Sequence, residues 1–190
     1  MAYDVAVDSS GVYIVGYDEY SGGGRWRIEK RSLTNGSVIW TQASNPSAYN
    51  DVAYDVAVDG TGVYVVGYDS YLGGINRRWR IEKRSLTTGT SIWTQTSNPS
   101  AFDDTAYSVA VDGSGVYIVG NDQYSGGGRW RIEKRSLMYG TSIWTKTSNP
   151  SASYDGATGV AVDSSGVYTV GSDDYLGNFN YRWRIEKRSP

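Results

Sequence analysis

The sequence predicts an all-β protein built from four tandem repeats. Three observations support this fold class. The chain repeats itself with offsets of 51, 53 and 51 residues, each repeat contains short β-branched and aromatic runs, and no window has the apolar spacing of an amphipathic helix. The segment at 2–8 (Ala-Tyr-Asp-Val-Ala-Val-Asp) returns at 53–59 and 106–112, and more loosely at 157–163.

Each repeat divides into four strands. In the first repeat we expect strands at 3–8, 12–17, 25–32 and 37–41. Ser9-Ser10-Gly11 and Thr34-Asn35-Gly36 separate two pairs of runs and are typical of tight hairpin turns. Four antiparallel strands in a repeat of this length are typical of β-propeller blades, whereas β-helix rungs are shorter and solenoid repeats such as ankyrin need helices. The predicted fold is one domain at 1–190, a propeller of four blades at about 1–50, 51–103, 104–154 and 155–190.

The tryptophans follow the repeat. A marker, Arg-Trp-Arg-Ile-Glu-Lys-Arg-Ser, occurs in all four copies, and Ile-Trp-Thr follows it in three. The seven tryptophans of the chain therefore occupy only two repeat positions: Trp26, Trp79, Trp130 and Trp183 in the marker, and Trp40, Trp93 and Trp144 in the later run. Because side chains alternate along a strand, we expect the marker tryptophans to lie opposite the arginines and to pack between blades.

These motifs resemble known propeller families. Val-Asp-Ser-Ser-Gly-Val-Tyr-Ile-Val-Gly-Tyr at 7–17 is similar to the SBBP and NHL repeats, and Leu-Thr-Asn-Gly-Ser-Val-Ile-Trp-Thr at 33–41 is similar to the tryptophan-bearing blades of PQQ-like propellers. The resemblance covers the whole chain and implies the fold. It carries over no cofactor residue, because PQQ-dependent dehydrogenases use a vicinal cysteine pair and this chain has no cysteine.

The number of strands leaves the ring size open. The fourth repeat lacks its last strand, so the strand expected at 181–189 is an outer edge, which its charged residues would protect from further pairing. The link between second and third strands is two residues longer in copies two and four than in copies one and three, so pairs of blades were duplicated. The chain is either a closed four-bladed ring or half of an eight-bladed ring completed by a homodimer. We favour the single ring, because one chain then covers its own blade faces. The abrupt ends favour an excised or engineered segment of a longer array.

A candidate binding site follows the second strand of every repeat. The long second-to-third connections and the long links between blades are both expected at one end of the blades, which we call the loop face. An Asp-x-Tyr motif there places four carboxylates and four phenols on the loop face, where they could hold a glycan or another small ligand by stacking and hydrogen bonds, or a hard cation. The residues are Asp18, Tyr20, Asp69, Tyr71, Asp122, Tyr124, Asp173 and Tyr175. The favoured structural interpretation is that each Asp bonds its own loop backbone while each Tyr covers the blade edge. Asp8, Asp59, Asp112 and Asp163 precede turns and are expected to form Asx turns.

Composition excludes several classes of chemistry. The chain has neither Cys nor His, which removes Ser–His–Asp catalysis, Cys nucleophiles and His-ligated or thiolate-ligated zinc. The doublets Asp103-Asp104 and Asp173-Asp174 are unsuited to a catalytic carboxylate pair, because adjacent side chains rarely converge on one bond. We expect no catalytic residue, no metal and no cofactor, and no segment that spans or targets a membrane.

The distribution of charged residues suggests a further, weaker alternative for the function. The formal net charge is −2, yet seventeen of the eighteen basic residues lie in or just before the Arg-Trp-Arg strands, where they could bind a polyanion. Each of these strands also carries a Glu, which would neutralise the arginines and argues against nucleic acid as a partner. The sequence thus favours a non-enzymatic propeller module that acts as a scaffold, interaction or assembly domain. Glycan or small-ligand binding is the alternative and polyanion binding the weaker one.

Overall fold

Strands make up all the regular structure in the described part of the chain. The computed structural model describes residues 1–71, 76–124, 127–149, 151–175 and 180–190. It contains four antiparallel sheets, three of four strands and one of three, and within each sheet the strands lie in chain order. No helix among these residues is long and apolar enough to cross a membrane. The predicted all-β fold of four tandem blades, the last with three strands, is confirmed.

The strand bounds follow the repeat. Blade 1 consists of β1 (Ala2–Asp8), β2 (Gly11–Tyr20), β3 (Gly23–Arg31) and β4 (Val38–Ser44). Blade 2 consists of β5 (Val52–Asp59), β6 (Gly62–Tyr71), β7 (Asn76–Arg84) and β8 (Ser91–Ser97). Blade 3 consists of β9 (Asp104–Asp112), β10 (Gly115–Tyr124), β11 (Gly127–Arg135) and β12 (Ser142–Ser148). Blade 4 consists of β13 (Gly156–Asp163), β14 (Gly166–Asp174) and β15 (Tyr181–Arg188). The second strands are longer than expected, and parts of three of the following links (72–75, 125–126 and 176–179) lie outside the described residues.

The first turn of each blade is fixed by an aspartate. In blade 1 the Asp8 Oδ1 atom accepts hydrogen bonds from the backbone N–H of Ser10 and Gly11, at 2.7 and 3.0 Å. The same bonds form at Asp59, Asp112 and Asp163. The hydrogen bond from the Ser165 hydroxyl, followed by those from the two backbone N–H groups, holds the pKa of the exposed Asp163 carboxyl below its usual range. The Asx turns expected from the sequence are therefore confirmed.

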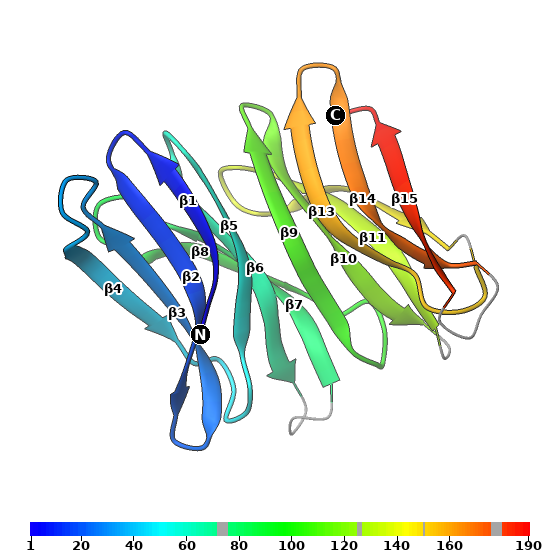
Figure 1. Ribbon diagram of the computed structural model, residues 1–190, viewed down its shortest axis with the longest axis horizontal. Coiled ribbons are helices and arrows are strands. Elements are labelled where there is room, and N and C mark those ends of the chain that lie inside the picture. Colours follow the sequence, from blue (N-terminus) through cyan, green and yellow to red (C-terminus); the bar gives the residue numbers. More distant parts are fainter. Residues whose placement is uncertain (72–75, 125–126, 150, 176–179) are drawn as a thin grey trace.

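The blades follow one another as an open array. Figure 1 shows blade 1 at one end and blade 4 at the other, with β5 and β9 between β1 and β13. Each first strand packs on the first strand of the next blade, β1 on β5, β5 on β9 and β9 on β13. Among the described residues no strand of blade 1 packs on blade 4 in this way, so the closed four-bladed ring that the sequence favoured is wrong for the single chain. The bulky side chains packed at each junction set the angle between neighbouring blades. Three such angles do not bring blade 4 into contact with blade 1.

The hydrophobic core lies in these junctions. Tyr13, Trp26 and Ile28 of blade 1 are buried against Val56 and Val65 of blade 2. An equivalent cluster joins blades 2 and 3, and a smaller one joins blades 3 and 4. The apolar second strands therefore contribute to packing on both faces of the inner blades.

Aspartates on the inner strands join one blade to the next. The Asp4 Oδ2 atom accepts the backbone N–H of Val56 at 3.0 Å, and Asp55 Oδ2 accepts that of Val109 at 2.8 Å. Ser108 takes the same place in blade 3 and accepts from Val160 at 3.3 Å. Burial, together with the hydrogen bond that the protonated Asp55 carboxyl donates to the neighbouring Asp4 carboxylate, raises the pKa of Asp55 well above its usual range.

This raised pKa predicts a pH-dependent stability. The folded protein retains the Asp55 proton at pH values where the unfolded chain has lost it, so the carboxyl contributes most below about pH 4 and its contribution is lost as the pH rises. Asp55→Ser copies the arrangement at Ser108 and removes the titrating group. We expect the free energy of unfolding to fall more steeply from pH 4 to pH 8 in the wild type than in Asp55→Ser, by about 1–3 kcal/mol in total. Urea unfolding at several pH values measures it, and equal slopes would contradict this assignment.

Candidate functional site

Each blade has two chemically different faces, which the third strand displays most clearly. Alternation along β3 places Trp26, Ile28 and Lys30 on the side that packs on blade 2, and Arg27 and Glu29 on the opposite side. We call the first side the leading face and the second the trailing face. At every junction inside the chain a leading face meets the trailing face of the next blade.

The marker tryptophan anchors each junction in the same way. The Trp26 indole N–H donates to the carbonyl oxygen of Tyr68 at 3.0 Å, Trp79 to that of Asn121 at 3.0 Å, and Trp130 to that of Ser172 at 2.9 Å. An arginine of the following blade covers each indole ring, and its guanidinium carbon lies 5.7 Å from the ring centroid. These pairs are Arg80 over Trp26, Arg131 over Trp79 and Arg184 over Trp130. The expected packing of the marker tryptophans between blades is confirmed for these three, which are fully buried.

The outermost blades leave one face of each kind uncovered. On the leading face of blade 4, Trp183 is 91% exposed and Ile185 is 72% exposed. On the trailing face of blade 1, Val5 is 59% exposed, whereas Val56 at the same position of blade 2 is 5% exposed. A hollow of about 590 Å³ lies on this trailing face and is lined in part by Gly16, Tyr17 and Arg27, while a second of about 480 Å³ adjoins Trp183. Neither surface was singled out from the sequence.

The Asp-x-Tyr motifs lie at the ends of the second strands, and an arginine links the two side chains of each. Asp18 is paired across the sheet with Arg25, whose Nε donates to Asp18 Oδ1 at 2.7 Å and whose guanidinium lies 4.3 Å from the centroid of the Tyr20 ring. The other three motifs repeat this arrangement: Asp69 and Tyr71 with Arg78, Asp122 and Tyr124 with Arg129, and Asp173 and Tyr175 with Arg182.

The carboxylates of these motifs are therefore occupied inside their own blades. The hydrogen bond from Arg25 is the largest cause that holds the pKa of Asp18 below its usual range. The partner is an arginine side chain rather than the loop backbone, which departs from the structural interpretation given to these aspartates. Among the interactions of the described residues, none joins one Asp-x-Tyr motif to another, so the four motifs lie as separate pairs.

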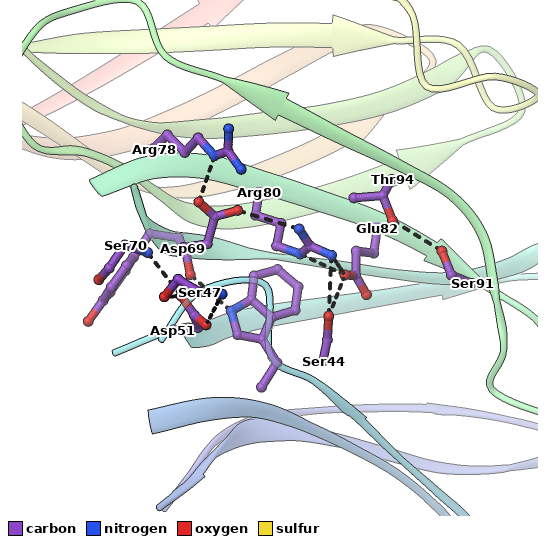
Figure 2. A network of polar contacts seen from close by, with 12 residues as sticks. Ser44, Ser47, Asp51, Asp69, Ser70, Arg78, Arg80, Glu82, Ser91 and Thr94 are labelled. Carbon is purple, nitrogen blue, oxygen red and sulfur yellow. Dashed lines mark hydrogen bonds and ion pairs between the residues drawn. The ribbon is translucent and has the colours of Figure 1, made fainter. Parts of the chain in front are cut away.

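The arginines of the third strand form a continuous ion-pair network. Figure 2 shows it in blade 2, where Asp69 bridges Arg78 and Arg80, and Arg80 continues to Glu82. Arg84 lies 2.5 Å from Glu82 Oε2, and Ser44 of the preceding blade donates a hydrogen bond to Glu82 Oε1 at 3.1 Å. The other blades have the same chain of ion pairs, in blade 1 from Arg25 through Asp18, Arg27 and Glu29 to Arg31. The charge that suggested polyanion binding is thus largely paired within each blade.

A second set of buried carboxylates was not recognised from the sequence. Asp51 accepts from Ser47 Oγ at 2.8 Å and from the backbone N–H of Ser70 at 2.9 Å, and so ties the link before β5 to the end of β6. Asp104 and Asp155 occupy the same position in the next two links. Burial raises the pKa of Asp104 to about 6. The sequence feature that could have identified these aspartates is the Ser-x-x-x-Asp spacing, which recurs in all three copies.

A cavity lined by tyrosines lies where blades 1 and 2 meet. Its volume is about 620 Å³, and Tyr3, Tyr17, Tyr20, Tyr54 and Tyr68 line it together with polar residues of the two neighbouring links. These links touch, because the backbone N–H of Asp51 donates to the Gly24 carbonyl at 2.7 Å. The expectation that both long connections share one end of the blades is confirmed there. Tyr20 is the only Asp-x-Tyr residue that lines this cavity.

The cavity is built for stacking and neutral hydrogen bonds. Tyr3 lies 5.3 Å from Tyr54, which in turn lies 5.8 Å from Tyr68 and 5.6 Å from Tyr107 (ring centroids). Burial raises the pKa of Tyr54 to about 12, so its phenol is uncharged at neutral pH. Uncharged phenols can offer both aromatic faces and O–H groups to a ligand.

Removal of a network carboxylate should cost more in the middle of the array than at its open end. Glu82→Gln leaves buried Arg84 without its counter-charge and leaves Arg80 with Asp69 alone, and we expect the free energy of unfolding to fall by about 3–5 kcal/mol. Glu29→Gln makes the same change in blade 1, where Arg27 and Arg31 reach solvent, and we expect no more than about half that loss. Denaturant unfolding of both variants measures the two losses of unfolding free energy. Equal losses would contradict the role of burial.

Comparison with known proteins adds no relative. No protein-family model matches the chain, and no curated protein is similar to it in sequence. The resemblance to SBBP, NHL and PQQ-like blades is therefore supported at the level of a propeller-like, all-β repeat architecture.

Proposed function

We propose that the chain is a non-enzymatic propeller-repeat module that works as a scaffold and assembly domain, through blade faces that other blades cover. One observation carries this proposal. Trp183 is 91% exposed, whereas the three tryptophans at the same position in blades 1 to 3 are fully buried under the following blade. The exposed leading face is thus chemically the same surface that is buried at every junction inside the chain.

The energetics of burial support assembly. Covering a large apolar side chain contributes about 1.5–3 kcal/mol relative to leaving it in water. Trp183 and Ile185 on one open face and Val5 on the other are all largely exposed, so covering both faces is worth several kcal/mol. Contiguous apolar surface of this kind marks interaction sites on soluble proteins.

The charged side chains support a structural rather than a catalytic or polyanion-binding role. The Asp-x-Tyr carboxylates and the marker glutamates are held in ion pairs by arginines of the same strand pair. A carboxylate so engaged is poorly suited to take or give a proton, and a paired arginine is poorly suited to bind phosphate or sulfate.

Assembly predicts that Trp183 is shielded in solution. The fluorescence of the wild type minus that of Trp183→Phe isolates the emission of this indole. At micromolar concentration we expect that emission to be blue-shifted and protected from acrylamide, and on dilution to return to that of an exposed indole. The matched control is Trp144→Phe, because Trp144 lies on the outer strand β12 and its emission should not depend on concentration. A difference spectrum typical of exposed tryptophan at every concentration would contradict the proposed function.

A second candidate function is the binding of a glycan or another small ligand in the tyrosine-lined cavity. The observation that favours it is the clustering of five tyrosines around one cavity of about 620 Å³, a volume within the usual range for ligand pockets. Aromatic faces with hydroxyl donors and acceptors suit a neutral sugar, which stacks on rings and exchanges hydrogen bonds.

A glycan array tests this second candidate. If the cavity binds a sugar, Tyr20→Ala should weaken binding at least about tenfold, because it removes one wall of the cavity. Tyr139→Ala is the control, since Tyr139 is exposed to a similar degree outside the cavity. Binding that is absent above background, or that both variants lower equally, would eliminate the candidate.

A further inference from the structure

The two open faces of the array are the two halves of the junction that the chain already contains three times. Blade 4 presents the leading half, with Trp183, Ile185 and Lys187 on β15. Blade 1 presents the trailing half, with the Tyr17 carbonyl on β2 and Arg27 on β3. Each half is incomplete only because its counterpart lies at the other end of the molecule (Figure 1).

The anchoring contacts have matching partners on the two faces. Trp26 donates to the carbonyl of Tyr68, whose equivalent in blade 1 is the carbonyl of Tyr17. That oxygen already accepts the terminal N–H group of Met1, and a carbonyl oxygen has a second lone pair for an indole N–H. Arg80 covers Trp26, and Arg27 is the equivalent residue that would cover Trp183.

A lysine supplies a further matching pair. Lys30 Nζ donates to the backbone carbonyl of Leu86 at 3.0 Å, and Lys83 Nζ to that of Leu137 at 3.0 Å. Lys187 on the open leading face stands at the same position as these lysines, and Leu33 of blade 1 stands at that of the two leucines. Leu33 is exposed, so its surroundings are accessible to an incoming lysine.

The trailing face of blade 1 also has room for the indole. A Cβ atom on Gly120 would lie 2.0 Å from the Thr105 carbonyl oxygen of its own blade, and 2.9 Å from Cζ2 of Trp79 across the junction of blades 2 and 3. This glycine therefore admits both its own first strand and the indole of the preceding blade. Gly16 holds that position in blade 1 and lines the hollow of about 590 Å³, with no indole above it.

We infer that a second copy of this chain covers both open faces, with two head-to-tail junctions that close an eight-bladed ring. The inference rests on the proposed assembly function and names its partner. A junction between unlike faces forms either a closed ring or an open filament, according to the rotation it imposes. The alternation of short and long links continues unbroken across the new junction, because blade 4 meets blade 1 as blade 2 meets blade 3. A ring of two chains is favoured over a filament, because it covers all four open faces, whereas a filament leaves one face of each kind in water at its ends.

The new junction has fewer contacts than those inside the chain. Position 159 is glycine where blades 1 to 3 have Asp4, Asp55 and Ser108, so the inner-strand hydrogen bond to the next blade has no acceptor. Blade 4 also has no fourth strand among its described residues to supply the bond that Ser44 makes to Glu82. Closure by two such junctions at once compensates, because the second forms within a complex already held by the first.

The molar mass of the full chain in solution tests the inference. We expect twice the 20.8 kDa of one chain at micromolar concentration, by size-exclusion chromatography with light scattering. Ile185→Lys should raise the dimer dissociation constant at least about tenfold by placing a charge in the junction. Ile92→Lys is the matched control, because Ile92 is 54% exposed on outer strand β8, away from both open faces. The dissociation constant of the Ile92→Lys dimer should equal that of the wild type.

A variant of the opposite face distinguishes head-to-tail assembly from pairing of two leading faces. Val5→Lys lies on the trailing face of blade 1 and should weaken the dimer as Ile185→Lys does. An equimolar mixture of the two variants should recover association, since one of its junctions has two wild-type faces. A Val5→Lys variant that dimerises like the wild type would overturn the inference, as would a monomer or a mass that grows beyond the dimer. If Trp183 is shielded despite such a result, the assembly function stands and only the partner is wrong.

Discussion

The fold depends on one repeated contact, in which an indole from one blade lies on the next blade beneath an arginine. Trp26, Trp79 and Trp130 each donate to a backbone carbonyl of the following blade and are covered by its arginine at the same distance. A single blade of about fifty residues has too little core to be stable alone. The blades are therefore held by what lies between them, and a blade without a neighbour leaves apolar surface in water.

The arginine network follows from that contact. An arginine over a buried indole is itself largely removed from water and needs a counter-charge, which the Asp and Glu of the same blade supply. The residues that looked like a ligand site and a basic surface in the sequence are thereby drawn into one structural system. In Figure 2 a serine of the preceding blade joins it as well, so the polar network crosses the junction beside the apolar core.

Much of this architecture could be predicted from the sequence, because the repeat places equivalent residues in equivalent environments. The strands, the Asx turns at Asp8 and its equivalents, and the packing of the marker tryptophans between blades all follow from local pattern. Ring closure could not be predicted, because the angle between blades depends on how side chains such as Tyr13 and Trp26 fill the junction. The partners of Asp18 were missed because Arg25 becomes its neighbour only through the register of β2 and β3. The role of Asp51 could not be predicted, because its two donors come from segments that are separate in the sequence, Ser47 in the link before β5 and Ser70 at the end of β6.

The exchange of the indole N–H hydrogens with solvent, followed by ¹⁵N NMR of the full chain, tests the central claim most directly. The seven tryptophans give seven indole signals. If the indole contact holds each blade to the next, Trp26, Trp79 and Trp130 exchange slowly, and Trp183 joins them at concentrations where the open faces are covered. Rapid exchange at Trp26, Trp79 and Trp130 would contradict the account.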